Sequence, residues 1–100
     1  MEPDFSASTG VFGISVASQM VGTGVQNLRL YERRGLVEPT RTPGGTRLYS
    51  QNDVDRIRRI VSLLNDDGLN LAGVAMVLQL EQRIDELEAT KNSASRGSTV

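Results

Sequence analysis

Glycine residues divide this chain of 100 residues into short segments, and their spacing limits the fold more than any other feature of the sequence. Gly22, Gly35 and Gly68 each follow a segment that is expected to be helical, and the pair Gly44-Gly45 lies between two short extended ones. Glycine commonly ends helices because it adopts the left-handed backbone conformation, and a glycine pair favours a hairpin turn. The sequence therefore predicts a mainly α-helical domain of short helices with one hairpin.

Capping residues predict where the first two helices begin. Ser15 is expected to cap a helix over 16–21, and Thr23 a second helix that ends at Gly35. Gln26 follows Thr23 at the spacing of a capping box. Two helices joined by so tight a turn indicate a helix-turn-helix.

The segments after Gly35 predict a hairpin and a third helix. Pro39 and Pro43 exclude a helix from 36–49, so the glycine pair is expected to turn a short hairpin there. Ser50 and Asp53 form a second capping-box pattern, which opens a helix that runs to about residue 65. Apolar residues recur along that helix with a period that predicts a buried stripe of Val54, Ile57, Val61 and Leu64.

Asn70 is expected to cap a long C-terminal helix, which carries apolar residues at alternating three- and four-residue steps. This spacing predicts a dimerisation seam of Val77, Leu80, Ile84 and Leu87. A chain this small buries a thin core, so a partner chain is expected on physical grounds. The alternative is an amphipathic helix that folds back on its own domain.

Composition excludes several classes of function. The chain has no Cys and no His, so we expect no disulfide, no metal site, no cofactor and no enzyme. No apolar run is long enough to span a membrane, and the start of the chain, Met1-Glu2-Pro3-Asp4, does not resemble a signal peptide. The expected location is the cytoplasm.

Positive charge gathers in one part of the chain, although the net charge is −1. Residues 26–60 hold eight Arg and four acidic residues, eight minus four or +4, and the remainder of the chain carries −5. Ten of the eleven basic residues are Arg, whose planar fork suits phosphates and guanine edges. A solvated basic face is the plainer alternative.

The second predicted helix has one polar face that fits the major groove of DNA. Gln26, Arg29 and Arg33 share this face, and Asn27 and Arg34 flank it. Arg can bind guanine, Gln or Asn can bind adenine, and flanking Arg can hold phosphates. On the hairpin, Arg41 and Arg47 are expected to lie close together and to contact the DNA backbone or minor groove.

Two strings of residues resemble the MerR family of bacterial transcription regulators. They are Leu28-Arg-Leu-Tyr-Glu-Arg-Arg-Gly-Leu-Val37 and Gly45-Thr-Arg-Leu-Tyr-Ser50, with Arg41 between them. The stretch 67–74, Asp-Gly-Leu-Asn-Leu-Ala-Gly-Val, resembles the heat-shock repressor (HspR) branch of that family. The resemblance covers about residues 12–90.

The resemblance implies a winged helix-turn-helix with a C-terminal dimerisation helix. The composition of the two ends, which lack helical periodicity, predicts a flexible arm over 1–11 and a disordered tail over 92–100. Between them the expected parts are a DNA-binding domain over 12–68 and a dimerisation helix over 69–91. The resemblance also implies that Tyr31 contacts DNA from the recognition helix and that Tyr49 lies at the base of the wing; both could instead be core aromatics. The residues expected to bind DNA are Thr23, Gln26, Asn27, Arg29, Tyr31, Arg33, Arg34, Arg41, Arg47 and Tyr49.

We therefore expect a transcriptional repressor that binds double-stranded, palindromic promoter DNA as a homodimer at the nucleoid. RNA polymerase and a chaperone are left open as further partners. One alternative is an excisionase-like architectural protein that bends DNA. Another is a protein-interaction module of the chaperone-modulator type.

Overall fold

The computed structural model describes the backbone of residues 6–98 and the side chains of residues 6–91. The chain forms two compact units, Met1–Gly68 and Leu69–Val100. The first unit contains α1 (Ile14–Val21), α2 (Val25–Arg33), β1 (Thr40–Arg41), β2 (Arg47–Leu48) and α3 (Gln51–Asn65). The second unit is the helix α4 (Leu71–Ser98).

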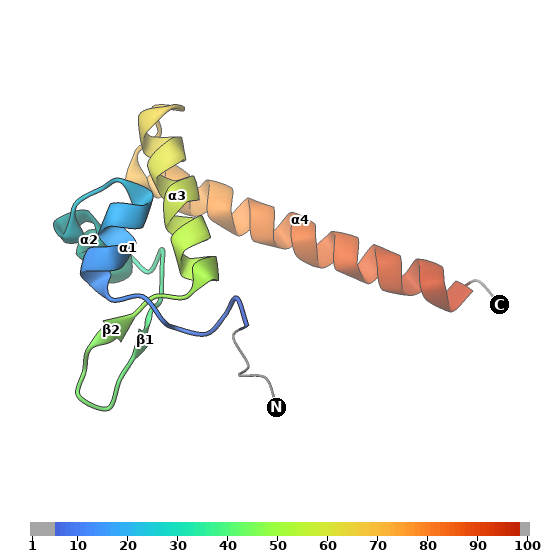
Figure 1. Cartoon of the computed structure of the whole chain (residues 1–100). Coiled ribbons are helices and arrows are strands. Elements are labelled where there is room, and N and C mark those ends of the chain that lie inside the picture. Colours follow the sequence, from blue (N-terminus) through green and yellow to red (C-terminus); the bar gives the residue numbers. More distant parts are fainter. Residues whose placement is uncertain (1–5, 99–100) are drawn as a thin grey trace. The chain divides into compact units, whose positions relative to one another are not determined.

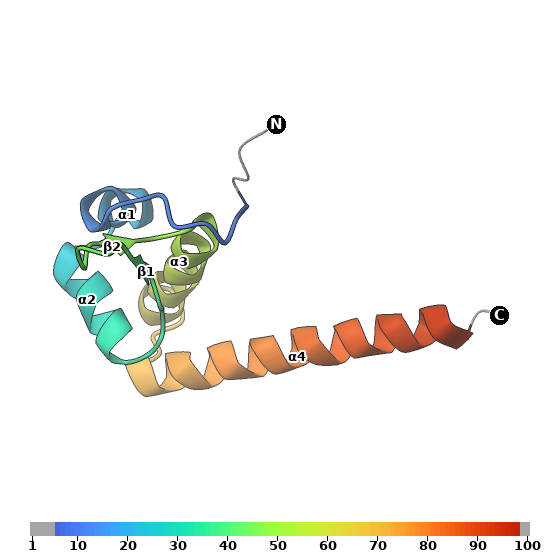
Figure 2. The same cartoon turned by 90° about the horizontal axis from the view of Figure 1, so that it is seen from below.

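In the first unit, α1 packs against both α2 and α3, and the hairpin of β1 and β2 projects from the three helices (Figure 1). Viewed from below, the three helices are arranged around the base of the hairpin (Figure 2). Apolar side chains from all three helices fill the core. Its buried members include Ala17, Leu28, Leu36, Val54, Ile57, Ile60 and Leu63.

The tight turn between α1 and α2 confirms the predicted helix-turn-helix. Gly22 ends α1 in the left-handed conformation, with φ of 72°, and its N–H donates to the carbonyl of Ser18. The start of α1 differs from the prediction, because the N-cap is Gly13 and not Ser15. Ser15 lies within the first turn of the helix and is exposed.

The predicted capping box of Thr23 and Gln26 is wrong. The N-cap of α2 is Gly24, and no side chain caps this end of the helix. The Thr23 hydroxyl instead accepts a hydrogen bond of 2.7 Å from Nδ2 of Asn27. The end of α2 agrees with the prediction, since Gly35 has φ of 71° and the Leu36 N–H donates to the carbonyl of Tyr31 at 2.9 Å.

The hairpin is antiparallel, with Thr40 opposite Leu48 and Arg41 opposite Arg47. The chain before α1 is tied to its base, because the N–H groups of Val11 and Phe12 both donate to the carbonyl of Tyr49. The flexible arm over 1–11 stays a prediction: Val11 is tied to the hairpin and the carbonyl of Ala7 accepts from the Asn52 N–H, while residues 1–5 lie outside the described part. Backbone pairing holds this segment, and such pairing depends little on side-chain type.

Helix α3 has the predicted capping box at Ser50 and Asp53. Its buried stripe was predicted only in part. Val54 and Ile57 are buried, but the stripe continues through Ile60 and Leu63, whereas Val61 and Leu64 are half-buried. Ile60, Val61, Leu63 and Leu64 are all apolar. The sequence pattern alone therefore does not show which two of them continue the buried stripe.

Helix α4 begins as predicted, since the Asn70 side chain accepts a hydrogen bond of 2.8 Å from the Gly73 N–H. It continues to Ser98, seven residues past the predicted end at residue 91. The predicted disordered tail is therefore helical over 92–98, and residues 99–100 lie outside the described part. The segment contains no Pro, so its composition disfavours a helix without blocking one.

Candidate nucleic-acid interface

Helix α2 presents the polar face that its sequence predicts. Leu28 and Tyr31 are buried and anchor one side of the helix in the core. The opposite side is open to solvent. Its exposed residues are Gln26, Asn27, Arg29, Arg33 and Arg34. Three guanidinium groups and two amide side chains therefore line one exposed helix surface, which is the chemistry that binds base edges and phosphates.

The beginning of α2 contains a small polar network centred on Thr23. The Thr23 hydroxyl is hydrogen-bonded to Asn27, and the hydroxyl of Tyr31 also forms a hydrogen bond with Thr23. Ser18 donates to the carbonyl of Thr23 from α1. Burial raises the pKa of Tyr31, and its hydrogen bond with Thr23 only partly opposes that rise. Tyr31 is thus a neutral core residue whose hydroxyl reaches the polar start of the helix.

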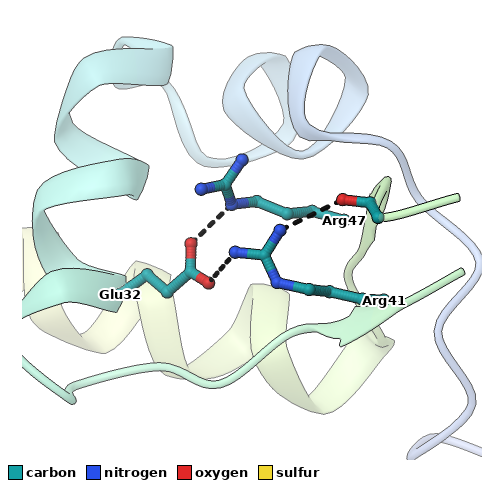
Figure 3. Close-up of polar contacts among 4 residues, drawn as sticks. Glu32, Arg41 and Arg47 are labelled. Atoms are coloured by element: carbon teal, nitrogen blue, oxygen red, sulfur yellow. Dashed lines mark hydrogen bonds and ion pairs between the residues drawn. The ribbon is translucent and has the colours of Figure 1, made fainter.

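The hairpin places Arg41 and Arg47 on paired positions, as the sequence predicts. Both side chains turn toward α2 and meet the carboxylate of Glu32 (Figure 3). Nη2 of Arg41 lies 2.8 Å from Oε2 of Glu32, and Nε of Arg47 lies 2.5 Å from Oε1. One carboxylate of the recognition helix therefore binds both arginines of the wing.

This ion pair changes the ionisation of Glu32. Partial burial raises the pKa of the carboxyl, but hydrogen bonds and positive charge from Arg47 and Arg41 outweigh it and lower the pKa below its usual value. Glu32 is therefore a carboxylate at neutral pH. This role of Glu32 was not predicted from the sequence, in which Glu32 is one acidic residue within a basic segment. The available signal was its position within the Leu28–Val37 string, beside the residues assigned to DNA.

Tyr49 is a core residue, and its predicted contact with DNA is wrong for this structure. The side chain is completely buried, and its hydroxyl has no hydrogen-bond partner among the described residues. Burial raises its pKa, and the negative charge of Glu32 adds to the rise while Arg47 opposes it. A hydroxyl without exposed surface cannot reach a phosphate, so Tyr49 supports the base of the wing from inside.

Two arginines of the basic segment serve the fold. Nε of Arg56, on α3, donates to the carbonyl of Leu36, and Nη2 of Arg58 donates to the carbonyl of Met20 at 3.3 Å. Both carbonyls lie at or just beyond helix ends, where backbone acceptors lack intrahelical partners. The positive charge counted over residues 26–60 is therefore only partly available to a ligand.

The predicted seam of α4 is exposed along most of its length. The side chains of Leu80, Ile84 and Leu87 are each more than half exposed, and Val77 is half-buried. Three large apolar residues at seam spacing on one helix form the kind of surface that a second helix covers. No described helix is long and apolar enough to cross a membrane, and the described residues contain no cluster of acidic groups that could hold a metal ion.

The tight turn, the exposed helix and the projecting hairpin define the first unit as a winged helix-turn-helix domain. The chain belongs to the MerR family: the sequence profile of the MerR HTH family of regulatory proteins matches residues 12–81. Both the fold class and the family predicted from the sequence are thereby confirmed.

Two curated relatives are similar to most of this chain. HspR of Streptomyces coelicolor is 43% identical over 86 residues, which cover 86% of this chain and 57% of that protein. The HTH-type transcriptional regulator GlnR of Bacillus anthracis is 40% identical over 84 residues, covering 84% of this chain and 63% of the relative. The chain thus spans about three-fifths of the length of these relatives.

A solved structure shares the fold. It is that of HiNmlR, described as a MerR family regulator lacking the sensor domain and bound to promoter DNA. The two chains superpose with a TM-score of 0.61 at 21% identity, over 85% of this chain and 71% of the other.

Proposed function

We propose that this chain is a sequence-specific DNA-binding transcriptional regulator, a repressor that binds an inverted-repeat promoter site as a homodimer. The observation that carries this proposal is the exposed face of α2, which projects Gln26, Arg29 and Arg33 from a helix whose other side is anchored in the core. A rigid helix with this face has the size and the donors that the major groove accepts.

Each candidate residue has a role that its position supports. Gln26, Arg29 and Arg33 are proposed to contact base edges, and Asn27, Arg34 and Thr23 to contact the backbone at the borders of the groove. Arg47 is proposed to contact a phosphate from the wing. Tyr31 is proposed to act through its hydrogen bond with Thr23.

The relatives support a regulatory role. GlnR is named a transcriptional regulator, and the HiNmlR structure contains promoter DNA. Repression is proposed because the stretch 67–74 resembles the heat-shock repressor branch of the family and the chain is 43% identical over 86 residues to HspR of Streptomyces coelicolor. Such a protein would act in the cytoplasm, at the nucleoid, and catalysis forms no part of the proposal.

The test is DNA binding by the full chain. Duplexes that bind the protein would be enriched from a pool of random sequences, which gives the selected duplex. The affinity of the protein for the selected duplex and for a scrambled version of it would then be measured by fluorescence anisotropy. We expect selection of an inverted repeat, with affinity that falls by about 10³-fold or more between 50 and 200 mM salt, because phosphate contacts release counterions. Failure to retain any duplex at low salt would refute the proposal.

Substitution within the recognition face sharpens this test. Arg29→Ala should cost about 1–3 kcal/mol of binding to the selected duplex and relax preference at one base position. Arg83→Ala removes the same charge from an exposed position of α4 and serves as the control. Equal effects of the two substitutions would remove Arg29 from the base-contacting residues.

Dimerisation is proposed to use the exposed seam of α4, because a second copy would cover Leu80, Ile84 and Leu87 at once. Analytical ultracentrifugation should show a dimer that Ile84→Glu converts to a monomer, whereas Gln82→Glu, on the same helix, should leave the dimer intact. A wild-type monomer that bends DNA would favour an architectural protein over a dimeric repressor.

A further inference from the structure

We propose that Glu32 is a positioning residue that couples the recognition helix to the wing and assigns different tasks to Arg41 and Arg47. The Nε atom of Arg47 is held by Glu32, and its guanidinium is directed toward a DNA phosphate. Arg41, although its side chain is 47% exposed, is retained as a brace by partners within the protein. This inference rests on the proposed DNA-binding function and extends it to a residue that contacts no DNA in the proposal.

The contact with Arg47 leaves the phosphate-binding end of its side chain available. Glu32 accepts from Nε, and the contact drawn in Figure 3 does not involve the two terminal nitrogens of Arg47. The terminal nitrogens are a pair of parallel donors that suits two phosphate oxygens. Pairing through Nε therefore fixes the plane and direction of the guanidinium without using that pair.

The contacts of Arg41 use the opposite end of its guanidinium. Nη2 donates to Glu32 at 2.8 Å, and Nη1 donates to the carbonyl of Gly45, in the turn of the hairpin, at 3.1 Å. Both terminal nitrogens thus have partners inside the protein. Arg41 therefore connects the tip of the hairpin to α2, which makes it a brace and not a primary DNA contact.

The carboxylate of Glu32 also offsets a charge repulsion between two arginines of the hairpin. Arg41 and Arg47 are directly opposite each other on paired strands, where like charges destabilise the pairing. The carboxylate of Glu32 lies between the two guanidinium groups and accepts from both (Figure 3). Its side chain is only 19% exposed, so solvent screens these contacts less than at an open surface.

A negative charge beside the DNA surface opposes binding to any duplex, so its benefit must lie in orientation. Removing the charge frees both arginines to form unspecific phosphate contacts and removes the alignment of α2 with the wing. Loss of the Glu32 charge should therefore have two effects. The affinity for the scrambled duplex should rise, and the ratio of the affinity for the selected duplex to that for the scrambled duplex should fall.

The experiment compares the wild-type chain with Glu32→Gln on the selected and scrambled duplexes across a salt series. We expect Glu32→Gln to bind the scrambled duplex about 2–5-fold more tightly at low salt, with a salt slope steeper by about 0.9 for one additional phosphate contact. The ratio of specific to nonspecific affinity should fall about tenfold, the effect of losing one oriented contact. A variant that had only lost folding stability would not bind nonspecific DNA more tightly than the wild type does.

Two further variants keep the test decisive. Glu38→Gln removes the same charge from an exposed position in the loop before β1 and should leave the affinity ratio unchanged. Glu32→Asp keeps the charge but shortens the side chain, so it should lower specific affinity without raising nonspecific affinity. If Glu32→Asp or Glu32→Gln keeps the wild-type ratio, the inference is wrong. If the wild type binds the selected and scrambled duplexes equally, the proposed sequence-specific function itself is wrong, which is a different outcome from failure of the inference about Glu32.

Discussion

Ser50 and Asp53 cap the first turn of α3 reciprocally. The Asp53 N–H donates to the Ser50 hydroxyl at 3.0 Å, and the Ser50 N–H donates to Oδ2 of Asp53 at 2.9 Å. Ser50 directly follows Tyr49 at the base of the wing and is itself buried. The capping box therefore sets the direction in which the chain leaves the hairpin and enters the core helix.

Removal of this cap should destabilise the domain. Ser50→Ala is expected to lower the free energy of unfolding by about 1 kcal/mol, because it leaves a backbone donor of the first turn without its acceptor. Urea denaturation followed by circular dichroism measures the change. Ser15→Ala is the matched control, since Ser15 is exposed and does not cap α1. Equal losses for both variants would show that the cap at Ser50 contributes nothing particular.

Gly10 allows the N-terminal segment to approach the wing. A Cβ atom at this position would lie 2.9 Å from the carbonyl oxygen of Leu48, closer than real Cβ atoms approach backbone atoms. Gly10→Ala should therefore cost about 1–3 kcal/mol and accelerate amide hydrogen exchange at Val11 and Phe12, whose N–H groups donate to Tyr49. Gly44→Ala, exposed in the hairpin turn, should change stability by less than about 0.5 kcal/mol.

The two tyrosines should respond differently to loss of the hydroxyl. Tyr49→Phe removes a buried hydroxyl that has no partner among the described residues, so stability should hold or rise by about 1 kcal/mol. Tyr31→Phe removes a hydrogen bond with Thr23 and should cost about 0.5–1.5 kcal/mol. Denaturant unfolding of both variants distinguishes the two cases. A large loss of stability in Tyr49→Phe would show that the Tyr49 hydroxyl does form a stabilising hydrogen bond, which would contradict this account.

Glu32 gives the domain an acid-dependent stability. Its pKa is lower in the folded chain than the usual glutamate value of about 4.3, so the ion pair stabilises the fold above that pH and is lost as the pH falls through the lower folded value. The stability difference between wild type and Glu32→Gln should therefore be constant near neutral pH and shrink below about pH 4. A difference that does not change with acidification would contradict the ion pair in solution.

Local chemistry accounts for what the sequence predicted correctly. The helix ends at Gly22 and Gly35, the cap at Ser50 and the exposed face of α2 each depend on residues within one or two turns of the chain. Such features follow from backbone preference and helical period, which the sequence displays directly.

Interactions between distant segments account for two features that could not be predicted from the sequence. The carboxylate of Glu32 pairs with Arg47 fifteen residues away, and the segment before α1 pairs through its backbone with Tyr49. Neither pairing has a sequence pattern of its own. Thr23 does not cap α2 because the helix begins one residue later, with Gly24 at the N-cap, and the Thr23 hydroxyl accepts from Asn27 instead.

The central claim is that α2 and the wing together form the surface that binds DNA. The most direct measurement is an NMR titration of the full chain with the selected duplex, following the backbone amides and the arginine Nε–H groups. We predict that the largest shifts occur at Gln26, Arg29 and Arg33 and at the Nε–H of Arg47. Shifts confined to α1, α3 or α4, with α2 and the hairpin unchanged at saturation, would contradict it.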